Sequence, residues 1–130
     1  MGTGAKLNRD DAPQKESLPG FEGRYLREDG YVLGFESFEQ AADFTPMYRG
    51  LPDDLCQSHH WGYVIKGRII MHRPEGDIVA NAGEAYYVGP GHTGEAGLPG
   101  TEVIEFSPAE EYDRTLEVVG RNLQAAMEQG

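Results

Sequence analysis

Two stretches of the sequence determine which fold and which site to expect: residues 53–67 (DDLCQSHHWGYVIKG) and residues 83–92 (GEAYYVGPGH). Together they contain three of the four histidines and the only cysteine. The first stretch runs into a β-branched and aromatic segment and the second leaves one, a composition typical of strands. Side chains that bind transition metals are therefore concentrated where predicted strands begin and end.

Further strand-like segments flank these two stretches. In residues 31–36 (YVLGFE), Tyr, Leu and Phe alternate with Val, Gly and Glu, which is the two-residue period of a half-buried strand. Residues 73–77 (RPEGD) carry proline and glycine in typical turn positions, and residues 101–106 (TEVIEF) follow another Pro-Gly turn. Many short strands separated by such turns predict an all-β, antiparallel sandwich or barrel over residues 21–106.

The two ends of the chain differ from this middle region. Residues 1–20 are polar and lack periodicity, which predicts a flexible N-terminal arm. Residues 107–130 predict a C-terminal amphipathic helix, in which Ser107 would cap the first turn and Pro108 would take the first helical position. This helix would pack on the barrel or form the contact of a homodimer, and the sequence leaves both open. Its apolar face is predicted to consist of Tyr112, Leu116, Val119, Leu123 and Met127.

Composition restricts the class of protein. A chain of 130 residues is long enough for one domain with its own core. The net charge of −11 argues against nucleic-acid binding, which needs clustered Lys and Arg. The sequence has no apolar run of the roughly 20 residues that span a membrane, and no apolar signal core. A single cysteine suits a reducing compartment, so we expect a cytoplasmic protein.

From about residue 30 to residue 106 the sequence resembles the cupin family, whose members are small β-barrels with a metal site in the barrel mouth. Residues 64–67 (VIKG) resemble the end of the first cupin motif, a strand that closes on a glycine. Residues 83–91 (GEAYYVGPG) resemble the start of the second motif, with both of its glycines in register and the proline one place late. The resemblance implies a cupin-like antiparallel β-barrel, that is, a double-stranded β-helix or jelly roll.

The positions that hold metal ligands in cupins carry other residues here. Counting back from the glycine that ends the first motif, His60 takes the place of the family's glutamate, and Cys56 and Asp54 take the places of its two histidines. In the second motif His92 follows the first glycine by nine positions, where the family's histidine follows by eleven. Two positions are one strand period, so His92 is still expected to face the interior.

These substitutes are chemically suited to a metal. Imidazole, thiolate and carboxylate groups are good ligands for zinc, iron and copper. Asp54, Cys56 and His60 have even spacing, so an extended chain would turn all three to one face. We predict a metal site formed by His60, His92, Cys56 and Asp54, with Zn²⁺ as the expected ion and Fe²⁺ as the alternative. An ion with one open position could activate water or polarise a carbonyl.

Each candidate also has a purely structural interpretation. Cys56 would be a small buried hydrophobe, His60 a hydrogen-bonded wall residue, His92 a loop residue and Asp54 a turn residue. His59 has the opposite parity to His60 and is expected to point away unless the strand is bulged there.

The remaining polar and aromatic residues are assigned to structure. His72 lies near a predicted hairpin turn and is expected at the surface. Most of the strand aromatics are expected to fill the core or pack under the helix: Trp61, Tyr63, Tyr86 and Tyr87. Most of the C-terminal glutamates are expected to be solvated: Glu102, Glu105, Glu110 and Glu111.

Two functional hypotheses follow. In the first, the chain is a small metal-binding enzyme acting on a small organic substrate, and the resemblance implies isomerase, cyclase, lyase or oxygenase chemistry. In the second, it is a non-catalytic cupin that binds or senses a small molecule without a catalytic metal. Fold does not imply function, so the sequence leaves substrate and reaction open.

Overall fold

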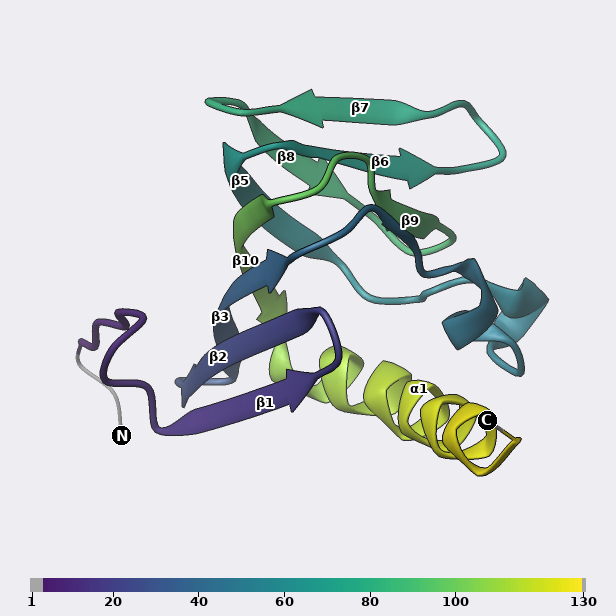
Figure 1. Ribbon diagram of the computed structural model, residues 1–130, viewed down its shortest axis with the longest axis horizontal. Coiled ribbons are helices and arrows are strands. Elements are labelled where there is room, and N and C mark those ends of the chain that lie inside the picture. Colours follow the sequence, from purple (N-terminus) through teal and green to yellow (C-terminus); the bar gives the residue numbers. More distant parts are fainter. Residues whose placement is uncertain (1–3, 130) are drawn as a thin grey trace.

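The computed structural model describes residues 4–129 and consists of ten strands, two 3₁₀ turns and one helix (Figure 1). Residues 1–3 of the predicted arm and residue 130 of the predicted helix lie outside the described residues. In chain order the elements are β1 (Gln14–Leu18), β2 (Phe21–Glu28), β3 (Tyr31–Phe38), β4 (Ala42–Asp43), η1 (Thr45–Tyr48), η2 (Pro52–Asp54), β5 (His60–Lys66), β6 (Arg68–His72), β7 (Ile78–Asn81), β8 (Ala85–Val88), β9 (Thr93–Ala96), β10 (Thr101–Pro108) and α1 (Ala109–Gln129).

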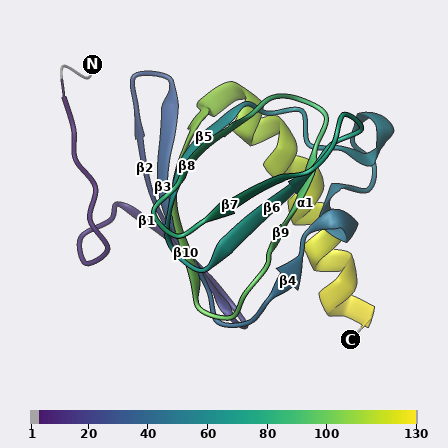
Figure 2. The ribbon, with the colours of Figure 1, turned by 90° about the horizontal axis from the view of Figure 1, so that it is seen from above.

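The strands form two antiparallel sheets. One sheet has six strands in the order β1-β2-β3-β10-β5-β8, and the other has four in the order β4-β9-β6-β7. Viewed from above, β6 and β7 lie in front and α1 runs behind the strands (Figure 2). The predicted class, antiparallel β with a C-terminal helix, is confirmed. Among residues 4–129 neither sheet is closed into a barrel, so the two sheets form a sandwich, one of the two arrangements that the strand pattern predicted.

The core lies between the sheets and follows the alternation of the strands. In β5, His60, Gly62 and Val64 are buried, while Trp61 and Tyr63 point outward and are about half exposed. Successive side chains of a strand face opposite sides. Because His60 faces inward, the rings of Trp61 and Tyr63 face outward. The expectation that most strand aromatics fill the core is therefore wrong for Trp61, Tyr63 and Tyr87, and right for Tyr86. The buried core cluster comprises Phe38, Val64, Ile69, Met71, Ala80, Tyr86, Val88, Ala96 and Val103.

A glycine makes the corner at which the chain passes from one sheet to the other. Gly67 separates β5 of the six-stranded sheet from β6 of the four-stranded sheet, and its φ is +80°. A Cβ at this position would lie 2.3 Å from Thr101 Oγ1 and 2.7 Å from Thr101 Cα. The corner therefore needs glycine both for its backbone conformation and for the close approach of β10.

The N-terminal segment contains a strand that the sequence did not indicate. Residues 14–18, within the segment predicted to be an irregular arm, form β1 and pair with β2 from Gln14↔Tyr25 to Leu18↔Phe21. The side chains of β1 are mostly exposed. Its pairing depends on the backbone hydrogen bonds of a neighbouring strand, which hydrophobic periodicity does not record.

The C-terminal helix starts later than predicted. β10 continues through Ser107 and Pro108, so Ser107 does not cap the helix, and its hydroxyl instead contacts a buried histidine. The helix has 21 residues, and its buried side differs from the predicted apolar face. Leu116 and Met127 of that face are exposed, whereas Thr115 is buried.

The helix packs at the end of the sandwich away from β7 (Figure 1). The ring of Tyr112 lies 6.1 Å from that of Tyr25, and the Asn122 amide donates to the Met47 carbonyl over 2.7 Å. These contacts fix α1 against β2 and η1. No helix among residues 4–129 is long and apolar enough to cross a membrane.

His72 lies at the surface as predicted, between Asp77 of the turn that joins β6 to β7 and Glu95 of β9. Its Nδ1 is 2.9 Å from Asp77 Oδ1 and its Nε2 is 3.1 Å from Glu95 Oε2. These two contacts raise the pKa of His72 above its ordinary value of 6.5. Asp43, whose strand pairs with that of Glu95, adds a further negative charge nearby.

Replacing His72 with glutamine is expected to destabilise the protein at pH 5.5 by at most about 1 kcal/mol, because the side chain is exposed and solvent-screened. Because the pKa of His72 is higher in the folded than in the unfolded protein, its contacts stabilise the folded state fully below pH 6.5. This stabilisation is lost as the pH rises through the pKa of the folded state. The difference in unfolding free energy between wild type and His72→Gln should therefore shrink towards pH 8.5. Urea titrations at a series of pH values measure it, and a difference that grows with pH would contradict the assignment.

Candidate metal centre

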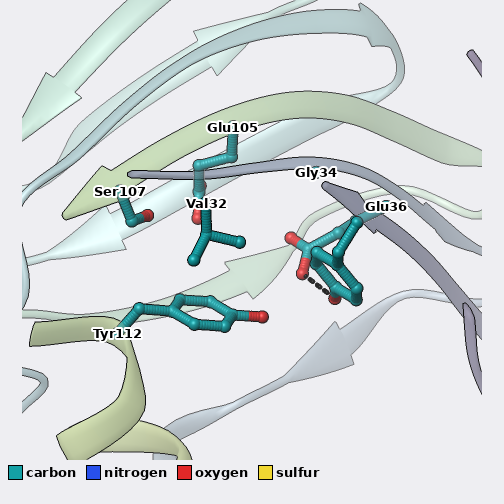
Figure 3. A pocket seen from close by; sticks show the side chains of 7 residues that line it. Val32, Gly34, Glu36, Glu105, Ser107 and Tyr112 are labelled. Atoms are coloured by element: carbon teal, nitrogen blue, oxygen red, sulfur yellow. Dashed lines mark hydrogen bonds between the residues drawn. The ribbon is translucent and has the colours of Figure 1, made fainter. Parts of the chain in front are cut away.

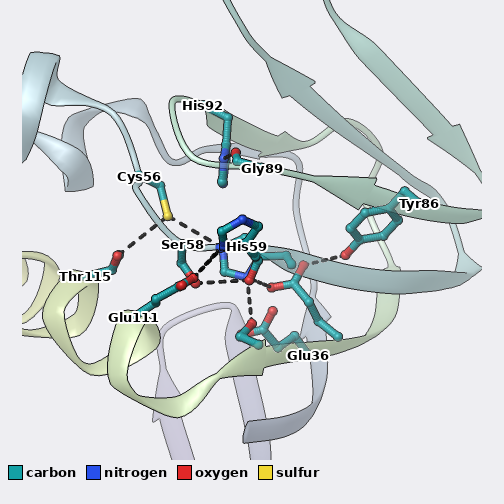
Figure 4. A network of polar contacts seen from close by, with 12 residues as sticks. Glu36, Cys56, Ser58, His59, Tyr86, Gly89, His92, Glu111 and Thr115 are labelled. Atoms are coloured by element: carbon teal, nitrogen blue, oxygen red, sulfur yellow. Dashed lines mark hydrogen bonds and ion pairs between the residues drawn. The ribbon is translucent and has the colours of Figure 1, made fainter. Parts of the chain in front are cut away.

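Three of the four predicted ligands meet inside the sandwich. Cys56 lies between η2 and β5, His60 opens β5, and His92 lies between β8 and β9. All three are buried, and their potential ligand atoms lie within 4.8 Å of one another. They are the one such group found among residues 4–129. Figure 4 shows Cys56 and His92 of this group with the polar side chains around them.

Backbone pairing brings the cysteine to the second histidine. Cys56 forms an isolated antiparallel bridge with His92, in which the Cys56 N–H donates to the His92 carbonyl over 2.8 Å. The Gly91 N–H donates back to the Cys56 carbonyl over 2.8 Å. His60 follows four residues later, and its Nε2 lies 3.5 Å from Cys56 Sγ. Thr115 of α1 reaches the same sulfur at 3.7 Å, so helix packing completes the pocket around it.

The second nitrogen of each histidine ring is held by a neighbour. His92 Nδ1 is 2.7 Å from the Gly89 carbonyl, which can only accept, so Nδ1 carries the proton and Nε2 is free. His60 Nδ1 is 2.6 Å from Ser107 Oγ and 3.3 Å from Glu105 Oε1. Its Nε2 therefore faces the cysteine. Metal-binding histidines commonly donate their other N–H in this way, which fixes tautomer and ring orientation.

Burial sets the charge state of the group. It lowers the pKa of His60 to about 4 and that of His92 to about 4, so both rings are neutral at pH 7. Burial also raises the pKa of the Cys56 thiol. Neutral imidazoles are ready to bind a cation, and a divalent ion would supply the attraction needed to ionise the thiol. The donor set of one sulfur and two nitrogens thus fits a transition-metal ion.

The fourth predicted ligand lies elsewhere. Asp54 belongs to the η2 turn with a φ of +58°, is exposed, and its Oδ1 accepts from the Gly50 N–H at 2.9 Å. The prediction that it faces the same side as Cys56 assumed an extended chain and is wrong in that respect. His59 points away from the group as parity suggested. Its Nδ1 lies 2.8 Å from Glu111 Oε1, and its ring stacks on Trp61.

Two carboxylates beside the group were missed by the sequence reading. Glu105 was expected in solvent, yet it lies on the inner face of β10 and accepts from the Tyr86 hydroxyl. Glu36 lies on the neighbouring strand β3 and accepts from the Tyr25 hydroxyl at 2.7 Å. Burial raises the pKa of each carboxyl to about 7, and for Glu36 the charge of Glu105 adds to this. The inward position of Glu105 could have been predicted from the two-residue period of a strand, because Glu105 lies on the same face as the buried Val103 and Ser107.

The two carboxylates line a small pocket (Figure 3). It is bounded by the inner face of the six-stranded sheet and the first turn of α1, and its lining comprises Tyr25, Val32, Gly34, Glu36, Glu105, Ser107 and Tyr112. Because Ser107 and Glu105 also contact His60, this pocket and the Cys/His/His group are continuous through shared side chains.

Comparison with known proteins identifies the fold. No protein-family model matches the sequence, and no curated protein matches it. Among solved structures, an RmlC-like cupin from Shewanella frigidimarina aligns with a TM-score of 0.55 and 16% identity, over 84% of this chain and 96% of that one.

Two further solved structures are similar. The polyketide cyclase RemF from Streptomyces resistomycificus aligns with a TM-score of 0.56 and 17% identity, over 82% of this chain and 80% of that one. KdgF from Halomonas sp. aligns with a TM-score of 0.51 and 17% identity, over 73% of this chain and 86% of that one. The two facing antiparallel sheets and these alignments together give this chain the cupin fold, as the two motif-like segments of its sequence implied.

Proposed function

We propose that this protein is a metal-binding cupin that uses Cys56, His60 and His92 to hold one divalent ion, most simply Zn²⁺, and that it acts on a small organic substrate in the adjoining interior. The observation that carries the proposal is the convergence of one thiol and two imidazoles to within 4.8 Å in a buried site. A site with three protein ligands leaves a position at which the ion can polarise a carbonyl or activate water.

The surroundings support a site built for more than packing. Ser107 and Gly89 orient the imidazoles, Glu105 lies 3.3 Å from His60, and Glu36 lines the same pocket as Glu105. Polar groups in a protein core are costly unless they are paired, and a purely structural core would favour apolar residues there. Cupin-fold neighbours include a polyketide cyclase, so enzymes with small organic substrates occur on this scaffold.

Metal analysis of the purified, zinc-reconstituted protein tests the proposal. About one equivalent of zinc is expected for wild type, and much less than one for Cys56→Ala, His60→Ala and His92→Ala. The matched control is His59→Ala, which removes the adjacent histidine outside the group and should keep the metal. Circular dichroism establishes that each variant is folded. Folded wild type without bound metal would reject the metalloprotein and favour a metal-independent binding or sensing cupin.

Cobalt substitution distinguishes a catalytic site from a closed structural one. Cobalt(II) bound through Cys56 should show a sulfur-to-metal charge-transfer absorption that is lost in Cys56→Ala. If one coordination position is open, adding azide should change the visible spectrum of the cobalt protein. A spectrum that azide leaves unchanged would indicate a closed site and contradict the catalytic part of the proposal.

Ser107 is expected to act as a positioning residue for His60. Replacing it with alanine removes the 2.6 Å partner of Nδ1 and should weaken zinc binding by about 10- to 100-fold, the usual range for such partners. Ser107→Thr, which keeps the hydroxyl, should restore most of the affinity. Competition with a chromophoric chelator measures both. Equal zinc affinity for wild type and the alanine variant would show that Ser107 does not position the ligand.

A further inference from the structure

The six-stranded sheet has an exposed aromatic surface on its outer face, the side turned away from the four-stranded sheet. Its inner face carries buried residues of alternate strand positions, so the residues between them point outward. All the aromatic side chains that are exposed among residues 4–129 lie on this outer face: Tyr31, Trp61, Tyr63, Tyr87 and Phe106. They are 39% to 49% exposed, so aromatic exposure is confined to one side of the molecule.

The register of the strands joins these side chains into continuous apolar rows. One row crosses four neighbouring strands and consists of Tyr87, Trp61, Phe106 and Leu33. The next row crosses three of these strands and consists of Tyr63, Ile104 and Phe35. No charged side chain interrupts either row. A contiguous apolar patch of this kind is typical of an interaction surface, whereas single exposed apolar residues need no explanation.

The charged side chains that border the rows pair with one another. Arg24 lies 2.8 Å from the Glu22 carboxylate. The Glu102 carboxylate lies 2.6 Å from Arg9 and 3.3 Å from Lys66. Three cationic side chains thus face two carboxylates at this border, although the chain as a whole carries −11. A second copy of the chain that approached this face would therefore meet little of the negative charge that repels copies elsewhere.

The shape and the area of the outer face suit a second β-sheet. Sheets pack through their apolar faces about 10 Å apart, with their strands nearly aligned. At about 200 Å² for a whole aromatic side chain, the five aromatics leave roughly 450 Å² accessible. A stable interface buries about 800 Å² on each partner. The aromatics would supply about half of this area, and the flanking apolar residues and the paired charges would form its polar rim.

We propose that the outer face of the six-stranded sheet is the contact between two copies of this chain, which pack their aromatic rows together around a two-fold axis. A two-fold contact needs a surface that is complementary to itself, and a second copy brings the same rows and the same paired charges. The contact differs from the helix-mediated dimer that the sequence left open, because α1 packs against its own sandwich. It does not depend on the metal centre, since the five aromatics face away from the interior.

Analytical ultracentrifugation over a dilution series, with chelator present to prevent association through metal ions, tests the proposal. Wild type is expected to sediment at twice the monomer mass of 14.3 kDa at the higher concentrations. Trp61→Glu and Phe106→Glu should each raise the dissociation constant at least about 100-fold, because the substitution puts an unpaired carboxylate of each copy into an apolar contact. Both positions are exposed in the single chain, so both variants should fold, and circular dichroism checks this.

The matched control is Val79→Glu. Val79 is 49% exposed and lies in β7 of the four-stranded sheet, away from the outer face. The control adds the same charge to the chain and should leave the dissociation constant unchanged. An equal loss of the dimer in all three variants would reflect net charge alone and overturn the proposal.

Trp61 also reports on this face without any substitution, because it is the only tryptophan of the chain. Its fluorescence emission should shift to longer wavelength as dilution separates the copies and exposes the ring to water. A wild type that is monomeric at every concentration would overturn the proposal. So would a dimer that persists in Trp61→Glu and Phe106→Glu, or one whose dissociation leaves the emission of Trp61 unchanged, since either would place the contact elsewhere.

Discussion

Replacing Gly67 with alanine is expected to lower the free energy of unfolding by about 2–4 kcal/mol. The positive φ alone costs a non-glycine residue about 1 kcal/mol. A Cβ 2.7 Å from Thr101 Cα would add an overpacking cost of about 1–3 kcal/mol, because it meets backbone that cannot rotate away. The corner between β5 and β6 would have to open, and with it the contact between the two sheets.

Gly83→Ala provides the matched control for this effect. Its φ of +88° is close to that of Gly67, but no atom lies within 4 Å of a Cβ built there. The control should therefore lose only the conformational part, about 1 kcal/mol. Urea unfolding followed by circular dichroism measures both variants. Equal losses would show that the close approach of Thr101 contributes nothing.

Zinc is expected to stabilise the folded protein by about 4 kcal/mol when its free concentration is 1,000 times its dissociation constant. The reason is that Cys56, His60 and His92 converge only in the folded chain, so the ion binds the native state in preference to the unfolded one. For a domain of this size the corresponding rise in melting temperature is roughly 10 °C or more. Thermal unfolding with added zinc and with added chelator measures the shift.

Two variants separate site binding from general effects of the ion. Cys56→Ala should abolish the zinc-dependent shift, and His59→Ala should preserve it, because His59 pairs with Glu111 outside the group. A melting temperature of the wild type that neither zinc nor chelator changes would contradict the metal centre. A shift that survives in Cys56→Ala would place the zinc elsewhere.

Local patterns predicted those features that depend on neighbours in sequence. The alternation in β3, the turn at residues 73–77 and the glycine that closes β5 were each recognisable, because strand period and turn chemistry act over a few residues. Cys56 and His60 could be paired from spacing, and His92 from its place after the second motif. Spacing could not exclude Asp54 from the metal site, because the spacing argument assumes an extended chain and Asp54 lies in the η2 turn.

Other features were decided by which strand lies next to which. Ser107 reads as a helix cap in isolation, yet β10 stays paired with β3 and β5 through that region and turns its hydroxyl to His60. Glu36 and Glu105 come from different strands, β3 and β10, and line one pocket only in the folded chain. Thr115 replaces Leu116 on the buried face of α1 because the sulfur of Cys56 and the η1 turn lie on that side.

The sequence by itself determined that this chain has antiparallel strands around a histidine- and cysteine-bearing core, because alternation and turn residues are local properties of the chain. The tertiary structure alone decided the composition of the site. It brought Cys56, His60 and His92 together, sent Asp54 to the surface, and placed the Glu105 carboxylate against His60 with Glu36 in the adjoining pocket. Contacts between distant segments depend on sheet order and register, which no short stretch of sequence encodes.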